Sequence, residues 1–207
     1  MKTLIIPCAG KSTRFQNMKP KWMLTHPDGK LMIEKAMEGL PLNKFDRIII
    51  TIVKEHALKY EAETILKQAL NLQKNRKIEI LKLDDFTSCQ SETVYLTLEK
   101  MKVKGEFVVK DSDNYVKVID CLKPEFIVGL DINKFDKEIY RLKSKSFLMV
   151  NDQNIITDII EKKIRSENIC LGVYGFNNPA KFIEAYNFLL LKHPSSSLDF
   201  QEVLLIF

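Results

Sequence analysis

Apolar and polar positions in the first half of the chain follow a repeated strand and helix pattern. Short apolar runs, typical of buried strands, alternate with segments whose apolar residues recur every three or four positions, as on one helix face. Strands are predicted at 4–7, 47–53, 78–83 and 107–109, and helices at 32–40, 57–72 and 93–101. Successive units of this kind predict a mostly parallel sheet with helices on both faces, whose ligands gather at the carboxyl ends of the strands.

The second half has a different pattern. A polar turn at residues 151–154 separates two apolar runs and is typical of a hairpin. Helical spacing from Phe182 to Leu189 predicts a helix that ends near Pro194. The strands of this half are expected at 147–150, 155–160 and 169–176. We therefore predict an α/β protein whose second half is mixed and partly antiparallel.

Length and composition favour one domain over residues 1–207. A chain of 207 residues with 45% hydrophobic content can bury one sizeable core. No apolar run is long enough to cross a bilayer, and the first residues lack the apolar region and cleavage site of a signal peptide. We predict a cytoplasmic protein with no membrane partner.

Charge does not favour nucleic-acid binding. The net charge is +5, but the 32 basic residues are interspersed with 27 acidic ones. The clusters at 75–77 and 143–145 are too short to form basic arms, and clustering creates the electrostatic footprint for nucleic acid. A mildly basic enzyme that acts on small polyanionic substrates explains the balance equally well.

Cysteines and histidines form no catalytic or metal-binding pattern. Without a C-x-x-C pair, neither a zinc ribbon nor a disulfide framework is indicated, so we expect the cysteines to be small core residues. The histidines have neither nucleophile–base nor metal-ligand spacing and are expected at the surface or at helix caps. These residues are Cys8, Cys89, Cys121 and Cys170, and His26, His56 and His193.

The segment that follows the first predicted strand is suited to binding phosphate. Glycine lets backbone amides come close to phosphate oxygens, and the neighbouring cations supply positive charge. A Walker A loop is excluded because it requires glycine at position 5, which is Ile5. An ordinary basic turn would explain Gly-Lys-Ser alone, but not the cations that follow. We expect this segment to bind phosphate, with Gly10 allowing the close approach and Lys11, Arg14 and Lys21 supplying charge.

A second candidate centre is the sequence Lys110-Asp111-Ser112-Asp113-Asn114, directly after a predicted strand. Two carboxylates two residues apart can supply oxygen ligands for Mg²⁺, which takes one or two protein carboxylates and shares the rest with phosphate and water. A solvated turn is the alternative, because Asp, Ser and Asn are also ordinary turn residues. Its expected position opposite the phosphate-binding segment favours the metal site.

Between these centres lies a polar segment at residues 87–93. Gln90 can both donate and accept hydrogen bonds and could therefore read the edge of a pyrimidine base. A plain helix N-terminus, capped by Ser88 or Ser91, explains the same residues. Both interpretations remain open at this point.

Together these motifs resemble the sugar-phosphate and phosphocholine-type nucleotidyltransferases. Their signature is A-G-x-G-T-R followed by P-K, and here Ser12 stands at the second glycine and Pro20-Lys21 at the end. The segment with Asp111 and Asp113 is similar to the D-x-D-N of phosphocholine cytidylyltransferases, which implies that Asp113 holds Mg²⁺. The resemblance implies a Rossmann-like, nucleotide-diphospho-sugar transferase fold. It also implies that Arg14 and Lys21 are catalytic. The residues that it implies contact the nucleotide are Ala9, Gly10, Lys11, Ser12, Thr13, Gln90 and Asp111.

The resemblance extends to an acceptor site. Glu161-Lys162 is similar to the family's E-K-P segment, with Lys163 at the proline position, and residues 171–176 are similar to its G-x-Y strand. This implies that Glu161, Lys162 and Tyr174 face the acceptor. A lysine on an exposed charged turn is the alternative for Lys162.

The resemblance implies a reaction of a nucleoside triphosphate with a phosphorylated small molecule, which releases pyrophosphate. The segment at 111–114 favours CTP and a role in surface-polysaccharide or related biosynthesis. A sugar-1-phosphate uridylyl- or thymidylyltransferase is the near alternative, and a catalytically idle nucleotide-binding subunit is the alternative from another class.

The C-terminal residues suggest a shortened version of the fold. The resembled enzymes supply a second metal-binding carboxylate after a helix like the one predicted at 182–191. Here Asp199 and Glu202 flank the start of a predicted helix, and the sequence ends in an apolar segment. We expect incomplete metal ligation and an apolar face at 203–207 that is exposed or covered by a partner, which leaves homo-oligomerisation open.

Overall fold

The computed structural model describes residues 1–11, 18–70, 78–118, 125–134, 142, 145–161, 163–192 and 203–204. Within these residues, eight strands form one sheet in the order β3-β2-β1-β4-β8-β6-β7, with β5 also paired to β8. The strands are β1 (Lys2–Pro7), β2 (Arg47–Val53), β3 (Ile78–Leu83), β4 (Glu106–Lys110), β5 (Phe126–Asp131), β6 (Ser146–Val150), β7 (Ile156–Glu161) and β8 (Asn168–Phe176). The helices are α1 (Met32–Glu38), α2 (Lys54–Lys59), α3 (Ala62–Leu70), α4 (Gln90–Lys100) and α5 (Pro179–Lys192), with short 3₁₀ turns η1 (Lys21–Met23), η2 (Leu42–Lys44) and η3 (Ile132–Lys134).

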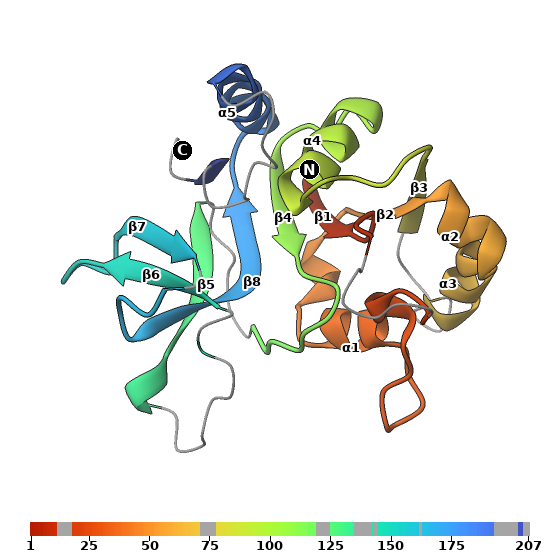
Figure 1. Ribbon diagram of the computed structural model, residues 1–207, viewed down its shortest axis with the longest axis horizontal. Coiled ribbons are helices and arrows are strands. Elements are labelled where there is room, and N and C mark those ends of the chain that lie inside the picture. Colours follow the sequence, from red (N-terminus) through yellow and green to blue (C-terminus); the bar gives the residue numbers. More distant parts are fainter. Residues whose placement is uncertain are drawn as a thin grey trace.

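The first four strands are parallel, and three of them, β1, β2 and β4, are largely buried. β1 lies between β2 and β4, and β3 extends the sheet beyond β2. Leu4 and Ile6 pack into a core with α1 and α3, whereas Ile5 points to the opposite face and packs with α4 and α5. Figure 1 shows these two pairs of helices on opposite sides of the parallel strands. The predicted parallel sheet with helices on both faces is confirmed.

The remaining strands are antiparallel, as predicted. β8 pairs with both β4 and β5, and β6 and β7 form a hairpin closed by the turn at 151–154. β5 was not predicted, although Phe-Ile-Val-Gly-Leu is a readable apolar run. Its Gly129 lies so close to β6 that a Cβ would be 2.9 Å from the Leu148 side chain. The glycine that weakens the strand signal thus allows close packing against Leu148.

Two helix boundaries differ from the prediction. The segment predicted as one helix at 57–72 is α2 and α3, separated by a turn in which Glu61 has a φ of 51°. The break lets Ala62, Leu66 and Leu70 face the core together. α4 begins at Gln90 rather than at Thr93, and its N-cap is Cys89 instead of a serine.

The apolar C-terminal segment is partly buried. Val203 is fully buried beside α5, and Leu204 packs against the same core. The prediction of an exposed or partner-covered face is therefore wrong for Val203, because the core of this half accepts it. Residues 199, 202 and 205–207 lie outside the described part. Among the described helices, none has the length and apolar character needed to span a bilayer.

Candidate functional site

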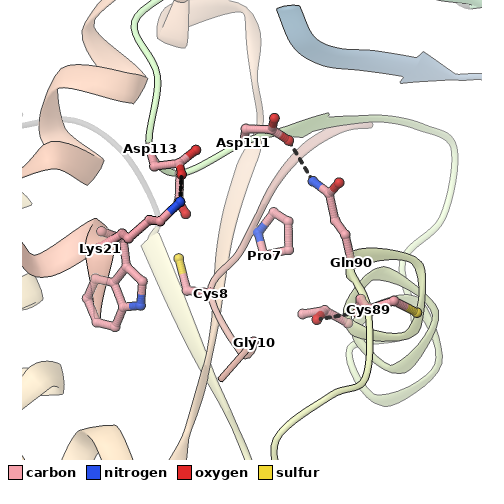
Figure 2. A pocket seen from close by; sticks show the side chains of 11 residues that line it. Pro7, Cys8, Gly10, Lys21, Cys89, Gln90, Asp111 and Asp113 are labelled. Carbon is pink, nitrogen blue, oxygen red and sulfur yellow. Dashed lines mark hydrogen bonds and ion pairs between the residues drawn. The ribbon is translucent and has the colours of Figure 1, made fainter. Parts of the chain in front are cut away.

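A cavity of about 380 Å³ lies at the carboxyl ends of β1 and β4 and beside the first turn of α4 (Figure 2). Neighbouring parallel strands end on the same edge of the sheet, so loops that are distant in sequence meet there. The described residues that line it are Pro7, Cys8, Gly10, Lys21, Trp22, Cys89, Gln90, Thr93, Asp111, Ser112 and Asp113. The cavity thus joins the predicted phosphate-binding, base-reading and metal-binding segments.

Lys21 and Asp113 form an ion pair across the cavity mouth. The Lys21 Nζ donates to Asp113 Oδ2 at 3.1 Å, although the two residues are 92 positions apart in sequence (Figure 2). Their side chains are 27% and 39% exposed, so an incoming ligand can reach both. The structure therefore brings the predicted catalytic cation and the predicted metal ligand together.

Asp111 forms the inner wall of the cavity. Its Oδ1 accepts a hydrogen bond from Gln90 Nε2 at 2.7 Å, and its backbone N–H donates to the Gly172 carbonyl at 2.9 Å. Burial raises the pKa of the Asp111 carboxyl, while the Gln90 hydrogen bond and the charges of Lys110 and Lys145 oppose that rise. Gln90 and Asp111 are thus held in one fixed arrangement, which joins α4 to the end of β4.

Lys110 is a site residue that the sequence reasoning missed. It is fully buried, and its Nζ donates to the carbonyl oxygens of Asp111 at 2.7 Å and Asn114 at 2.9 Å, and also to the Asn114 side-chain oxygen. Burial lowers the Lys110 pKa to about 8, and the neighbouring Asp111 and Asp113 charges oppose that shift. The available signal was a lysine that ends an otherwise apolar strand, directly before an acidic turn.

The phosphate-binding segment is described only in part. The buried Ala9 accepts a hydrogen bond from the Thr87 N–H at 3.1 Å, which holds the end of this segment beside the α4 loop. Gly10 is exposed at the cavity, and a Cβ there would meet no atom within 4 Å. Lys11 is exposed as well. Ser12, Thr13 and Arg14 lie outside the described residues, so their roles stay predictions.

Of the predicted acceptor residues, Tyr174 and Glu161 are not among the described residues that line this cavity. Tyr174 is buried in the core of α4 and α5, where its hydroxyl accepts from the Cys170 thiol at 3.3 Å. Burial raises the Tyr174 pKa well above its usual value, and the Asp111 charge adds to the shift. Glu161 ends β7, opposite Ser146, and is not among the described residues that line the cavity. Lys162 lies outside the described part.

The predictions for the cysteines and histidines have mixed outcomes. Cys8 is buried as expected, and burial raises its pKa. Cys89 and Cys170 are half-buried. His26 is exposed beside Asp28, as predicted. Cys121 and His193 lie outside the described residues.

His56 contradicts the prediction of a surface or capping residue. Its side chain is only 5% exposed, and its ring packs edge-on against Phe86 and near Trp22 at the cavity wall. Burial lowers its pKa, which favours the neutral imidazole. In the described part of the chain, neither His56 Nδ1 nor the Trp22 indole N–H has a hydrogen-bond partner. His56 is the buried residue of α2, so its burial follows from how this helix packs and not from a local pattern.

The donor set fits Mg²⁺ that is shared with a substrate. Asp113 presents a partly exposed carboxylate, and Asp111 presents a second one nearby on the same cavity. No group of three or more His, Cys, Asp or Glu side chains suited to a metal was found among the described residues. Mg²⁺ commonly takes one or two protein carboxylates and completes its shell with phosphate oxygens and water.

The parallel β3-β2-β1-β4 sheet, with its cavity at the carboxyl edge and an antiparallel second half, is the nucleotide-diphospho-sugar transferase fold. No protein-family model matches the sequence, and no curated protein sequence matches it either.

Three solved structures with this fold are distant from this chain in sequence. A nucleoside-diphosphate-sugar pyrophosphorylase from Vibrio cholerae RC9 has a TM-score of 0.78 and 19% identity, over 98% of this chain and 86% of that one. A UDP-glucose pyrophosphorylase complexed with UDP-glucose has a TM-score of 0.69 and 16% identity, over 99% and 85%. The inositol-1-phosphate CTP transferase from T. maritima has a TM-score of 0.63 and 14% identity, over 98% and 79%. At such identities the likeness establishes the fold, while function depends on the site.

Proposed function

We propose that the protein is a nucleotidyltransferase that joins a nucleotide, with CTP favoured, to a phosphorylated small acceptor and releases pyrophosphate. The observation that carries this proposal is the meeting of Lys21, Gln90, Asp111 and Asp113 in one cavity at the carboxyl edge of the sheet. A movable cation, an amide and two carboxylates are the groups needed to hold a triphosphate, a base and Mg²⁺.

The proposed chemistry is an in-line displacement at the α-phosphorus. An oxygen of the acceptor phosphate forms the new P–O bond as the bond to the bridging oxygen breaks, and pyrophosphate leaves with that electron pair. The second pKa of a phosphate monoester is about 6, so the attacking oxygen is already largely ionised at neutral pH. No general base is required, and catalysis depends on positioning and charge neutralisation.

Each site residue has a role in this proposal. Lys21 exchanges Asp113 for the α-phosphoryl oxygens, while Arg14 and the amides of Gly10 to Thr13 hold the departing pyrophosphate. Asp113 holds Mg²⁺, which supplies neutralising charge to the phosphates when bound. The Gln90 amide, held by Asp111, faces the base.

The acceptor residues are assigned on the resemblance alone. Glu161 and Lys162 belong to the segment that is similar to E-K-P. Tyr174 is buried, so in this proposal it would support Asp111 and not touch the acceptor directly. The proposal includes one domain and a cytoplasmic enzyme of surface-polysaccharide or related biosynthesis, on the same resemblance.

CTP is favoured by the D-S-D-N segment and is consistent with the likeness to the inositol-1-phosphate CTP transferase. The second candidate is a sugar-1-phosphate uridylyl- or thymidylyltransferase. The likeness to the nucleoside-diphosphate-sugar and UDP-glucose pyrophosphorylases favours it.

A release assay for pyrophosphate tests both candidates. The protein is incubated with Mg²⁺, each of CTP, UTP, dTTP and ATP, and each of phosphocholine, inositol-1-phosphate and glucose-1-phosphate, with Lys21→Met as the matched control. We expect release with CTP and one non-sugar acceptor, and release about 100-fold slower from the control. Release with UTP or dTTP and glucose-1-phosphate would establish the second candidate. Tight nucleotide binding without any turnover would indicate an idle subunit and contradict the proposal.

A further inference from the structure

Lys110 is the last residue of β4 and follows three buried apolar residues. The preceding residues Phe107, Val108 and Val109 are at most 1% exposed, and β4 lies between β1 and β8 in the middle of the sheet. A charged side chain is costly to bury, and lysine is almost never fully buried without partners. A lysine at this position therefore requires a compensating function.

All three oxygens that accept from the Lys110 Nζ belong to the turn at residues 111–114. The ammonium group thus holds the turn together by binding three of its oxygens, as a bound metal cation would. The turn is also tied to β8, because the Asp111 N–H donates to the Gly172 carbonyl and Asn114 Nδ2 donates to the Leu171 carbonyl, both at 2.9 Å. The backbone that carries the two carboxylates is therefore held from two sides.

The positive charge of Lys110 also acts on the two carboxylates. Asp111 and Asp113 lie near enough to raise the Lys110 pKa against the larger effect of burial. By the same interaction, Lys110 reduces the repulsion between two negative charges that face one cavity. Lys110 itself is not among the described residues that line this cavity.

We infer that Lys110 is a positioning residue: an internal cation that fixes the 111–114 turn so that Asp113 and Asp111 face the cavity ready for a divalent metal. This inference rests on the proposed function, because it assigns Lys110 to the metal site of that reaction. Lys110 acts only through these neighbours and contacts no substrate. Partners of this kind behind metal ligands typically contribute 10- to 100-fold to metal affinity or activity.

Lys110→Met tests the inference, since methionine has a similar length but no charge and no donor. The control is Lys104→Met, which changes an exposed lysine just before the same strand. Mn²⁺ binding is measured by electron paramagnetic resonance without nucleotide, and CTP binding by calorimetry in EDTA. We expect Mn²⁺ affinity to fall about tenfold or more in Lys110→Met, with CTP affinity within about twofold of wild type, because the phosphate and base contacts remain.

Several results would overturn the inference. Unchanged Mn²⁺ affinity with a lowered melting temperature would leave Lys110 a purely structural residue, and an equal loss of Mn²⁺ and CTP affinity would mean general collapse of the site. If Lys110→Met does not fold, Asn114→Ala removes the side-chain contact to Lys110 and the hydrogen bond to the Leu171 carbonyl. It should show the same selective loss of Mn²⁺ affinity, and unchanged Mn²⁺ affinity would contradict the inference. A wild type that binds no Mn²⁺ would overturn the proposed metal site together with this inference, whereas binding that Lys110→Met retains would overturn this inference alone.

Discussion

Gly172→Ala is predicted to disrupt the site through a single atom. Gly172 has a φ of +68°, a left-handed conformation that favours glycine. A Cβ at this position would lie 2.0 Å from Asp111 Oδ2 and 2.4 Å from Asp111 Cγ, far closer than any normal contact. The Asp111 carboxylate must therefore move away, and its hydrogen bond to Gln90 would be lost.

The cost has two parts that can be separated. A non-glycine residue in the left-handed conformation costs about 1–2 kcal/mol. Loss of a hydrogen bond to a charged group costs about 1.5–3 kcal/mol more. Gly172→Ala should therefore lower the free energy of unfolding by about 2.5–5 kcal/mol. In an Asp111→Ala background the two clashing atoms are absent, so the same change should cost only the conformational part.

Urea denaturation of the two single variants, the double variant and the wild type measures this coupling, which we expect at about 1.5–3 kcal/mol. Gly29→Ala is the matched control, because Gly29 has a φ of +87° but a Cβ there would meet no atom within 4 Å. It should show the conformational cost alone. Additive effects of Gly172→Ala and Asp111→Ala, or equal costs at Gly172 and Gly29, would refute the close approach of Gly172 to Asp111.

Three further predictions concern the cavity and its wall. Lys21→Ala and Arg14→Ala should each lower kcat/KM by about two orders of magnitude through loss of a preorganised charge, with an unchanged circular dichroism spectrum; wild-type kcat/KM would mean that the segment is an ordinary turn. Asp113→Asn should abolish Mg²⁺-dependent turnover, and Asp111→Asn should reduce it less. EDTA should abolish wild-type activity, and full activity in the chelator would show that the reaction needs no metal. Burial lowers the pKa of His56 below its usual 6.5, so His56 takes up a proton more readily in the unfolded state than in the folded state. Wild-type stability should therefore decrease as the pH falls below about 6.5. His56→Phe should remove that part of the loss in calorimetric melting temperature, and equal pH slopes would contradict this account.

Local pattern was sufficient for most of the parallel half. The run at 47–53 coincides with β2 because a strand buried on both faces must be apolar at almost every position. The run at 78–83 coincides with β3, a half-buried strand in which charged residues stand among the apolar ones. Helix ends were harder to predict from the sequence, because the break at Glu61 depends on which side chains of α3 pack toward the sheet. β5 was missed because Gly129 weakens the strand pattern, and its close packing against Leu148 of β6 exists only in the tertiary structure.

The candidate chemistry divides in the same way. Sequence alone marked Lys21, Asp111 and Asp113, because a glycine with following cations and paired carboxylates are informative at short range. It left Gln90 open between a base contact and a plain helix N-terminus. Only the tertiary structure brought Lys21 to Asp113 and Gln90 to Asp111, since strand order decides which loops share an edge. It also buried Tyr174 and His56, which had been assigned to an acceptor site and to the surface. A lysine at the end of a strand ordinarily reaches solvent, and the position of β4 between β1 and β8 is the physical reason that Lys110 lies inside instead.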